Sequence, residues 1–335
     1  MDPALAQPGW TEDQWNRICT TVTEEAQKAR VAAQILPIVG TDDPSAVSVP
    51  RFAVERRQDA AGNDRLSINS DPDLYLTRIS VNVELRSQEF ADPSLNAGLQ
   101  KFRRAASIIA RVEDALIFYG RRDANPPVVA APQGENPPFS QPRSVLNAPS
   151  TSLPVFGSLV QITSDRHNVG GIFTRDPLDP RFPPDRQWYR PGRVWLDPLF
   201  RAVLRKGARG GLGEGVANTI VSAIDAIESR GYFGPFACAL GHTLFEAICS
   251  PSPSLVLPRD RILPFLQGPL LRASSIEHNF GIVIALGASP VEIVVASPIH
   301  VKFLQTDQHS NRVFRVTERI ALRIRDQGAI QQIAG

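Results

Sequence analysis

The sequence predicts an α+β fold in which two long amphipathic helices flank a polar β arm and a run of strands closes the chain. Three observations indicate this class. Apolar residues recur at helical spacing in two stretches, a two-residue alternation runs through 78–86, and β patterning returns from residue 280 onward. The chain has 335 residues, 42% of them hydrophobic, so it can bury a large core as two domains or one elaborated domain.

The first helix is predicted from its cap and its apolar stripe. Thr11 can cap the helix, and Gln14 can reach back to it. The side chains that then recur at helical spacing, through about Ala33, are Trp15, Ile18, Val22 and Ala26. A short apolar segment, 35–39, is expected next, before Gly40.

Residues 47–76 predict a β-hairpin arm. Segments 49–58 and 65–70 have strand composition and flank a tip at 60–64. The arm is strongly charged, with Arg51, Glu55, Arg56, Arg57, Asp59, Asp64 and Arg65. Because an isolated hairpin is marginally stable in water, we expect another element to hold the arm, most simply a neighbouring subunit.

A half-buried strand and a long helix are expected after the arm. One face of the strand carries Ile79, Val81, Val83 and Leu85. Asp92 is expected to cap a helix that begins at Pro93, because proline suits a first helical turn. The apolar stripe continues to Tyr119, which makes a rod of roughly 40 Å, and Gly120 is expected to end it.

The middle of the chain predicts less regular structure. Proline is dense from 121 to about 192, which excludes helix and central strand. We expect an irregular insertion on the outer surface, with short strands at 153–162 and 169–173. The glycine-rich stretch 207–215 lacks the phosphate-binding loop pattern and is expected to be a flexible hinge. Helices are expected at 216–230 and 243–249, with a strand between them.

Strands are expected at 280–286, 291–296 and 301–305, followed by a long last strand. One face of the last strand carries Arg315, Arg319, Arg323 and Arg325. Such a basic strip could bind nucleic acid. We favour pairing with acidic residues of neighbouring strands or subunits, because the net charge is only +2.

Composition and motifs argue against several other function classes. The near-neutral charge does not supply the basic surface that coats nucleic acid. No apolar run approaches the roughly 20 residues of a membrane-spanning helix, and no signal peptide is recognised. The three cysteines form no CxxC pair, and the five histidines no HExxH motif. We therefore expect no catalytic residue, metal site, cofactor or membrane partner, and a cytoplasmic protein.

Five short motifs carry a resemblance to a known family. They are Thr11–Trp15, Val83–Arg86, Glu113–Phe118, Gly231–Phe236 and Thr317–Ile324. In this order and at this spacing they resemble the encapsulin nanocompartment shell proteins, over residues 10–120 and 215–333. The resemblance implies a phage-capsid-like fold with an N-terminal helix, an extended β arm, a long spine helix in a peripheral domain, and an axial α/β domain.

The resemblance also implies domain boundaries. The N-terminal helix and the start of the peripheral domain would occupy 1–46, and the arm 47–76. The peripheral domain with its long helix would follow at 77–120. The remaining divisions would be the proline-rich insertion at 121–199, the axial domain at 200–275 and peripheral-domain strands at 276–335.

The function that the resemblance implies is structural. The chain would self-assemble as an icosahedral homo-oligomer, a closed compartment around cargo enzymes that carry a short targeting peptide. Nucleic acid would not be a partner. The alternative is a phage or prophage major capsid protein that packages DNA. The short segment before the first helix favours the compartment.

Two sites follow from the resemblance. The peptide-docking positions would be Ile35, Ile299, Val301 and Phe303, which could equally be core residues. Ala33 and Pro37 stand where many members have an arginine and an aspartate, which departs from the usual docking pattern. The pore loop would be Ser250, Pro251, Ser252, Pro253 and Ser254, and its lack of charge predicts weak electrostatic selection of ions.

Overall fold

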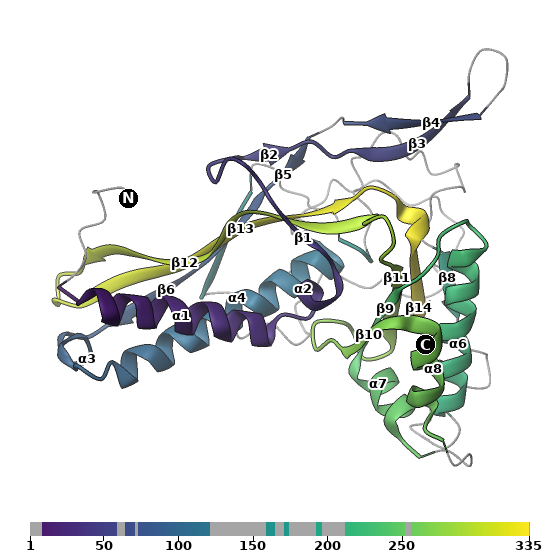
Figure 1. Ribbon diagram of the computed structural model, residues 1–335. Coiled ribbons are helices and arrows are strands. Elements are labelled where there is room, and N and C mark those ends of the chain that lie inside the picture. The colour runs from purple at the N-terminus through teal and green to yellow at the C-terminus, as the bar shows by residue number, and fades with distance from the viewer. Residues whose placement is uncertain are drawn as a thin grey trace, which may run out of the picture.

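The computed structural model describes residues 9–58, 64–70, 73–120, 159–164, 171–173, 192–195, 212–251 and 256–334. Within this part the strands form two five-stranded sheets and two short strand pairs. One sheet with its helices is elongated, and the other stands at its end with a second group of helices (Figure 1). The α+β class and the capsid-like element order expected from the sequence are confirmed.

The first sheet forms the elongated part. Its strands lie in the order β1 (Ile38–Gly40), β12 (Val291–Thr306), β13 (Arg312–Ile324), β6 (Thr77–Leu85) and β7 (Val160–Thr163). β1 runs parallel to β12, and the other neighbours are antiparallel. Helices α1 (Glu12–Ala29) and α4 (Asn96–Tyr119) pack against each other and against this sheet (Figure 1).

The second sheet stands beside three further helices. Its strands lie in the order β10 (Gln267–Arg272), β9 (Phe236–Leu240), β11 (Phe280–Ala285), β14 (Ile330–Ala334) and β8 (Gly192–Trp195). The helices are α6 (Leu212–Glu228), α7 (His242–Cys249) and α8 (Pro258–Leu266), and the 3-10 turn η2 (Gln327–Ala329) leads into β14. The segment 276–335 is therefore divided between the two sheets.

The arm lies above the first sheet. Its base is the pair β2 (Ser48–Val49) and β5 (Leu74–Tyr75), and its outer part is the hairpin β3 (Ala53–Gln58) and β4 (Asp64–Asn69). Figure 1 shows the hairpin projecting beyond the sheet. The hairpin expected from the sequence is confirmed; of the tip expected at 60–64, Asp64 begins β4 and residues 60–63 lie outside the described residues.

Helix α1 begins as predicted and ends earlier. Thr11 and Gln14 form the capping box, and Ile18, Val22 and Ala26 are buried. The helix stops at Ala29 instead of continuing to about Ala33, and a separate turn, α2 (Ala32–Ile35), follows. The physical reason is the Asp114 carboxylate, which accepts the backbone N–H groups of Val31 and Ala32 at the start of that turn.

The long helix also begins later than expected. Asp92 is not its N-cap residue: its carboxylate accepts hydrogen bonds from the backbone N–H and hydroxyl of Ser94, and the N-cap position falls on Leu95. Leu95 then takes a left-handed conformation with φ of 54°, and α4 starts at Asn96. A short helix, α3 (Ser87–Ala91), occupies part of the preceding stretch. Gly120 ends α4 as predicted.

Two further expectations need correction. The strands expected at 291–296 and 301–305 are one strand, β12, because Pro298 falls where the register with β13 shifts, a position where a strand tolerates proline. The residues from Leu212 onward are not a hinge but the first turn of α6. A Cβ on Gly213 would lie 2.4 Å from the carbonyl oxygen of Ala247, so glycine permits α6 and α7 to approach closely.

The proline-rich insertion lies almost wholly outside the described residues. Of the first expected strand, residues 160–162 lie in β7 and 153–158 are outside the described residues; the described residues 171–173 of the second form a bend. One apolar cluster runs through both sheets, since buried residues of β9 and β11 belong to the same cluster as those of α1, α4 and β6, and a second lies between the second sheet and helices α6, α7 and α8. The two halves of the fold are therefore packed as one body.

Candidate assembly surfaces and the buried junction behind them

The outer part of the arm exposes large apolar side chains. Leu66 is 81% exposed and Ile68 is 71% exposed, and both lie on β4 two residues apart, hence on one face of the hairpin. Val54 is paired with Ile68 across the hairpin. A two-stranded ribbon with an exposed apolar face is a surface suited to burial against another protein chain.

Arg315, Arg319, Arg323 and Arg325 form an arginine row along β13 and just beyond its end. Members of this row bind the base of the arm to the first sheet. Arg319 donates hydrogen bonds to the carbonyl oxygens of Ser45 and Ala46, at 2.9 and 2.8 Å. Arg323 and Arg325 both pair with Glu292 of β12, which is 2% exposed. The interpretation that acidic residues of neighbouring strands pair with this row is correct for these two arginines.

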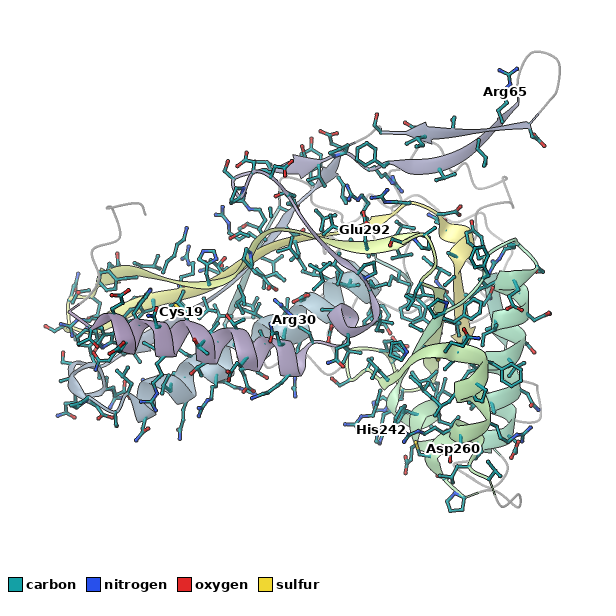
Figure 2. The ribbon with its side chains drawn as sticks, viewed as in Figure 1. Cys19, Arg30, Arg65, His242, Asp260 and Glu292 are labelled. Carbon is teal, nitrogen blue, oxygen red and sulfur yellow. The ribbon has the colours of Figure 1, made fainter. Side chains whose placement is uncertain are left out.

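A buried junction of four charged groups joins α1, α4 and β13. Arg30, at the end of α1, pairs with Glu113 of α4 at 2.5 Å and with Glu318 of β13. Asp114, next to Glu113, receives the backbone N–H groups of Val31 and Ala32 at 2.8–3.0 Å. Figure 2 shows Arg30 at the meeting point of the first helix with the long helix.

The junction contains three carboxyl groups and one guanidinium group. The three carboxyl side chains are nearly wholly buried. Burial raises the pKa of Asp114 to about 7, and the backbone N–H donors only partly oppose this. Burial, with the nearby Glu318 charge, raises the pKa of Glu113 well above its ordinary value, and burial likewise raises the pKa of Glu318. At neutral pH part of this acid cluster therefore remains protonated.

The sequence did not predict this junction, although three of its four members fall within the motifs that carry the family resemblance. Glu113 and Asp114 stand in an otherwise apolar helix segment, and Glu318 interrupts the apolar face of the last strand. Charged residues inside an apolar pattern are the signal that could have found them. Arg30 carries no such local signal, because its partner Glu318 is 288 residues away.

The predicted docking positions lie in or beside the core. Ile35, Ile299 and Val301 are 4%, 7% and 5% exposed, and Phe303 is partly buried against Phe314 at 5.5 Å between ring centroids. Ile299, Val301 and Phe303 share one face of β12, whereas Ile35 lies in α2, just before the strand that pairs with Ile293–Val295. Their role in docking stays a prediction.

The predicted pore loop is only partly described. Ser250 ends α7, and its hydroxyl donates to the carbonyl oxygen of Glu246 at 2.8 Å. Pro251 follows it, and Ser252, Pro253 and Ser254 lie outside the described residues. The weak ion selection expected for this loop stays a prediction.

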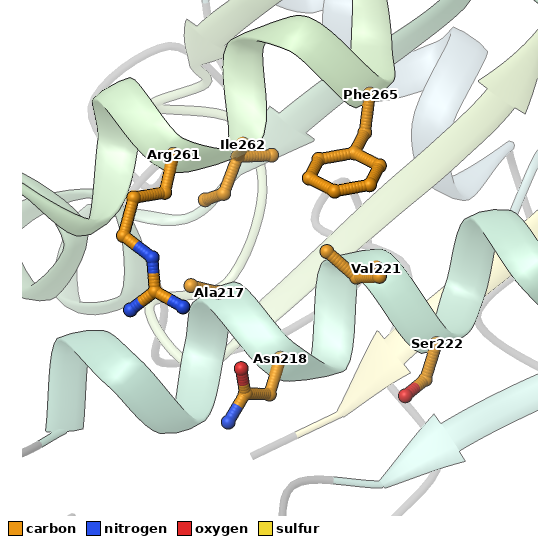
Figure 3. Close-up of a pocket in the computed structure, with 7 residues that line it drawn as sticks. All are labelled: Ala217, Asn218, Val221, Ser222, Arg261, Ile262 and Phe265. Atoms are coloured by element: carbon orange, nitrogen blue, oxygen red, sulfur yellow. The ribbon is translucent and has the colours of Figure 1, made fainter.

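A cleft of about 320 Å³ lies between α6 and α8 (Figure 3). Its lining residues are Ala217, Asn218, Val221, Ser222, Arg261, Ile262 and Phe265. The charged group among them, Arg261, is ion-paired with Glu214. This lining combines no nucleophile with a neighbouring base, so the cleft does not have the arrangement that acyl or proton transfer requires.

The described residues contain no group of three or more histidine, cysteine or acidic side chains that could hold a metal ion. His242 and His278 lie 5.9 Å apart between ring centroids, and His242 is within 3.7 Å of Glu246, but no third ligand completes a site among the described side chains. No described helix is both long and apolar enough to span a bilayer.

Comparisons with known proteins agree with this geometry. A family described as "Encapsulating protein for peroxidase" matches residues 8–136 and 208–321, which is most of the chain. No curated protein matches the sequence.

Solved structures with a similar fold are particle shells. A virus-like particle from Pyrococcus furiosus is similar with a TM-score of 0.55 and 12% identity, over 96% of this chain and 99% of that one. The capsid of Myoviridae phage XM1 has a TM-score of 0.53 and 9% identity, over 90% and 89% of the two chains. The capsid of an empty GTA particle has a TM-score of 0.52 and 14% identity, over 91% and 90%. At these identities the likeness concerns the fold.

Proposed function

The chain belongs to the family of encapsulating proteins for peroxidase, a family of structural shell subunits, and from this premise we propose that it assembles with copies of itself into a closed icosahedral compartment that encloses a cargo enzyme. No catalytic role is proposed for the chain itself. Its partners in this proposal are further copies of the chain and a cargo protein with a short targeting peptide. A cytoplasmic location belongs to the same proposal, since Cys19, Cys238 and Cys249 are all free thiols.

The exposed face of the arm is the observation that supports self-assembly. Leu66 and Ile68 expose most of their surface on a two-stranded ribbon that none of the other described strands extends. Burial of each side chain against a neighbour would contribute roughly 1.5–3 kcal/mol per subunit. A closed shell repeats that contribution at every copy, because each subunit both offers an arm and receives one.

The test is size-exclusion chromatography and electron microscopy of the purified chain, beside a Leu66→Ser/Ile68→Ser variant. We expect hollow particles of one size from the unaltered chain. The variant subunit should fold normally, because both residues are exposed. It should, however, form no particles. A control with Thr23→Ser, an exposed position on α1, should assemble normally. An unaltered chain that remains monomeric would refute the proposal.

The contents of the particles test the second part of the proposal. Particles with a low ratio of absorbance at the nucleic-acid maximum to that at the protein maximum, and with a co-purifying protein, support cargo enclosure. Particles filled with DNA would instead support the phage-capsid alternative. Peptide docking is tested with Phe303→Asp, because Phe303 is the partly buried member of the four predicted docking positions. Assembled particles of this variant should retain less cargo at unchanged particle yield.

A further inference from the structure

The base of the arm is fixed to the first sheet by side chains of one arginine row. Arg319 reaches the carbonyl oxygens of Ser45 and Ala46, just before the arm begins. Further along β13, Arg323 donates one hydrogen bond to Glu292 and another, at 3.2 Å, to the carbonyl oxygen of Pro50. The row therefore contacts the chain at two successive points as it enters the arm.

The strand end of β13 supplies a third contact. The backbone N–H of Val54, the second residue of β3, donates to the carbonyl oxygen of Arg325 at 2.8 Å. Arg325 itself pairs with Glu292 at 2.9 Å. Between these points Phe52 holds a left-handed φ of 51°, and its ring lies 5.5 Å from the guanidinium carbon of Arg323. A non-glycine residue keeps this backbone conformation where its surroundings determine it.

A small apolar cluster completes the support beneath the arm. Val49 and Leu76, on either side of the arm base, pack with Val294, Ala296 and Ala321 of the sheet. Beyond this cluster the hairpin carries the exposed Leu66 and Ile68. Figure 2 shows Glu292 beneath the arm base and Arg65 close to the outer end of the hairpin. A small rotation at the base therefore displaces these side chains by a distance that grows with the length of the hairpin.

We propose that Arg319 and Arg323, together with Glu292, are positioning residues that set the direction in which the arm leaves the sheet, and thereby the angle at which neighbouring subunits meet. The inference rests on the proposed self-assembly. A rigid arm gives one angle between subunits and hence one curvature and one particle size. An arm released from the arginine row takes a range of directions, so the subunits form particles of several sizes or open sheets.

The test compares conservative variants on the same face of the same strand. Arg323→Lys keeps a positive charge for Glu292 but replaces the planar fork that reaches Glu292 and Pro50 together. Arg319→Met removes the contacts to Ser45 and Ala46. The matched control is Arg315→Lys, because Arg315 bonds to Asn82 of β6 and not to the arm. Particle diameters are measured by electron microscopy, melting temperatures by calorimetry, and exchange of the Val54 N–H by hydrogen–deuterium exchange.

We expect the control to give the single particle size of the unaltered chain. Arg323→Lys and Arg319→Met should lose that single size class, and Arg323→Lys should exchange the Val54 N–H faster, while the melting temperatures stay close to that of the control. One particle size in all variants would overturn the inference, and so would faster Val54 exchange without any change in size. Absence of particles from the unaltered chain would instead refute the proposed function, and Val54 exchange would still report on the base of the arm.

Discussion

Replacement of Asp114 by asparagine tests the electrostatics of the buried junction. Burial raises the pKa of this carboxyl from its ordinary 3.8 to about 7. A group whose pKa is raised by folding contributes most favourably below its unfolded pKa, and its contribution is lost as the pH rises toward the folded pKa. The unaltered protein should therefore lose stability through this group between about pH 4 and pH 7. Asparagine does not titrate and removes this loss.

The size of the effect follows from the pKa shift. From about pH 5 to pH 7 the loss is about two pH units at about 1.36 kcal/mol each, or about 3 kcal/mol. For a chain of 335 residues, whose unfolding entropy is about 0.7 kcal/mol/K, this corresponds to about 4 °C in melting temperature. Measured by scanning calorimetry, the melting temperature of Asp114→Asn minus that of the unaltered protein should increase by this amount over the same pH interval.

The control for this experiment is Glu24→Gln, which removes an exposed carboxylate from α1. Its melting temperature should follow the unaltered protein at every pH. If Asp114→Asn also runs parallel to the unaltered protein across this interval, Asp114 is ionised throughout, and the argument from its burial is wrong. Amide exchange at Ala32, which donates to Asp114 at 2.8 Å, provides a local check.

Three further predictions concern packing. Gly241→Ala should prevent accumulation of folded protein in an expression trial, because a Cβ there would lie 2.0 Å from the Glu277 carbonyl oxygen, whereas Gly40→Ala, with no atom within 4 Å, should express normally. Phe314→Ala should lower stability by about 3–5 kcal/mol and shift the fluorescence of Trp10, whose ring stacks on Phe314 at 4.8 Å, as measured by denaturant titration. Cys238 is wholly buried and burial raises its thiol pKa, so mass spectrometry should find it unalkylated by iodoacetamide until the protein is unfolded.

The parts of the fold that depend on neighbouring residues in sequence were predictable. The capping box of α1 involves residues three apart, and the alternation that predicted β6 reflects burial of one strand face. The predicted start of α4 was wrong. Asp92 can serve either as a helix cap or as a hydrogen-bond acceptor for Ser94, and the sequence does not decide between these two roles. Two strands were expected where β12 is one, because a register shift in β12 cannot be foreseen from one strand alone.

The assembly surfaces were predictable only in outline. Charge and composition indicated an arm that needs a partner, but not that Leu66 and Ile68 share its exposed face. The arginine row was visible, while its partners Ser45 and Pro50 lie about 270 residues earlier and are backbone carbonyls, which carry no side-chain signal. The buried junction depends on the same kind of distant contact, between Arg30 and Glu318.

The position of β14 in the second sheet has a consequence for the time at which the chain becomes competent to assemble. β14 lies between β11 and β8, so this sheet stays divided until residues 330–334 have left the ribosome. The first sheet has a similar delay, because β6 pairs with β13, more than 200 residues later. Both five-stranded sheets therefore remain incomplete until β13 and β14 have been synthesised.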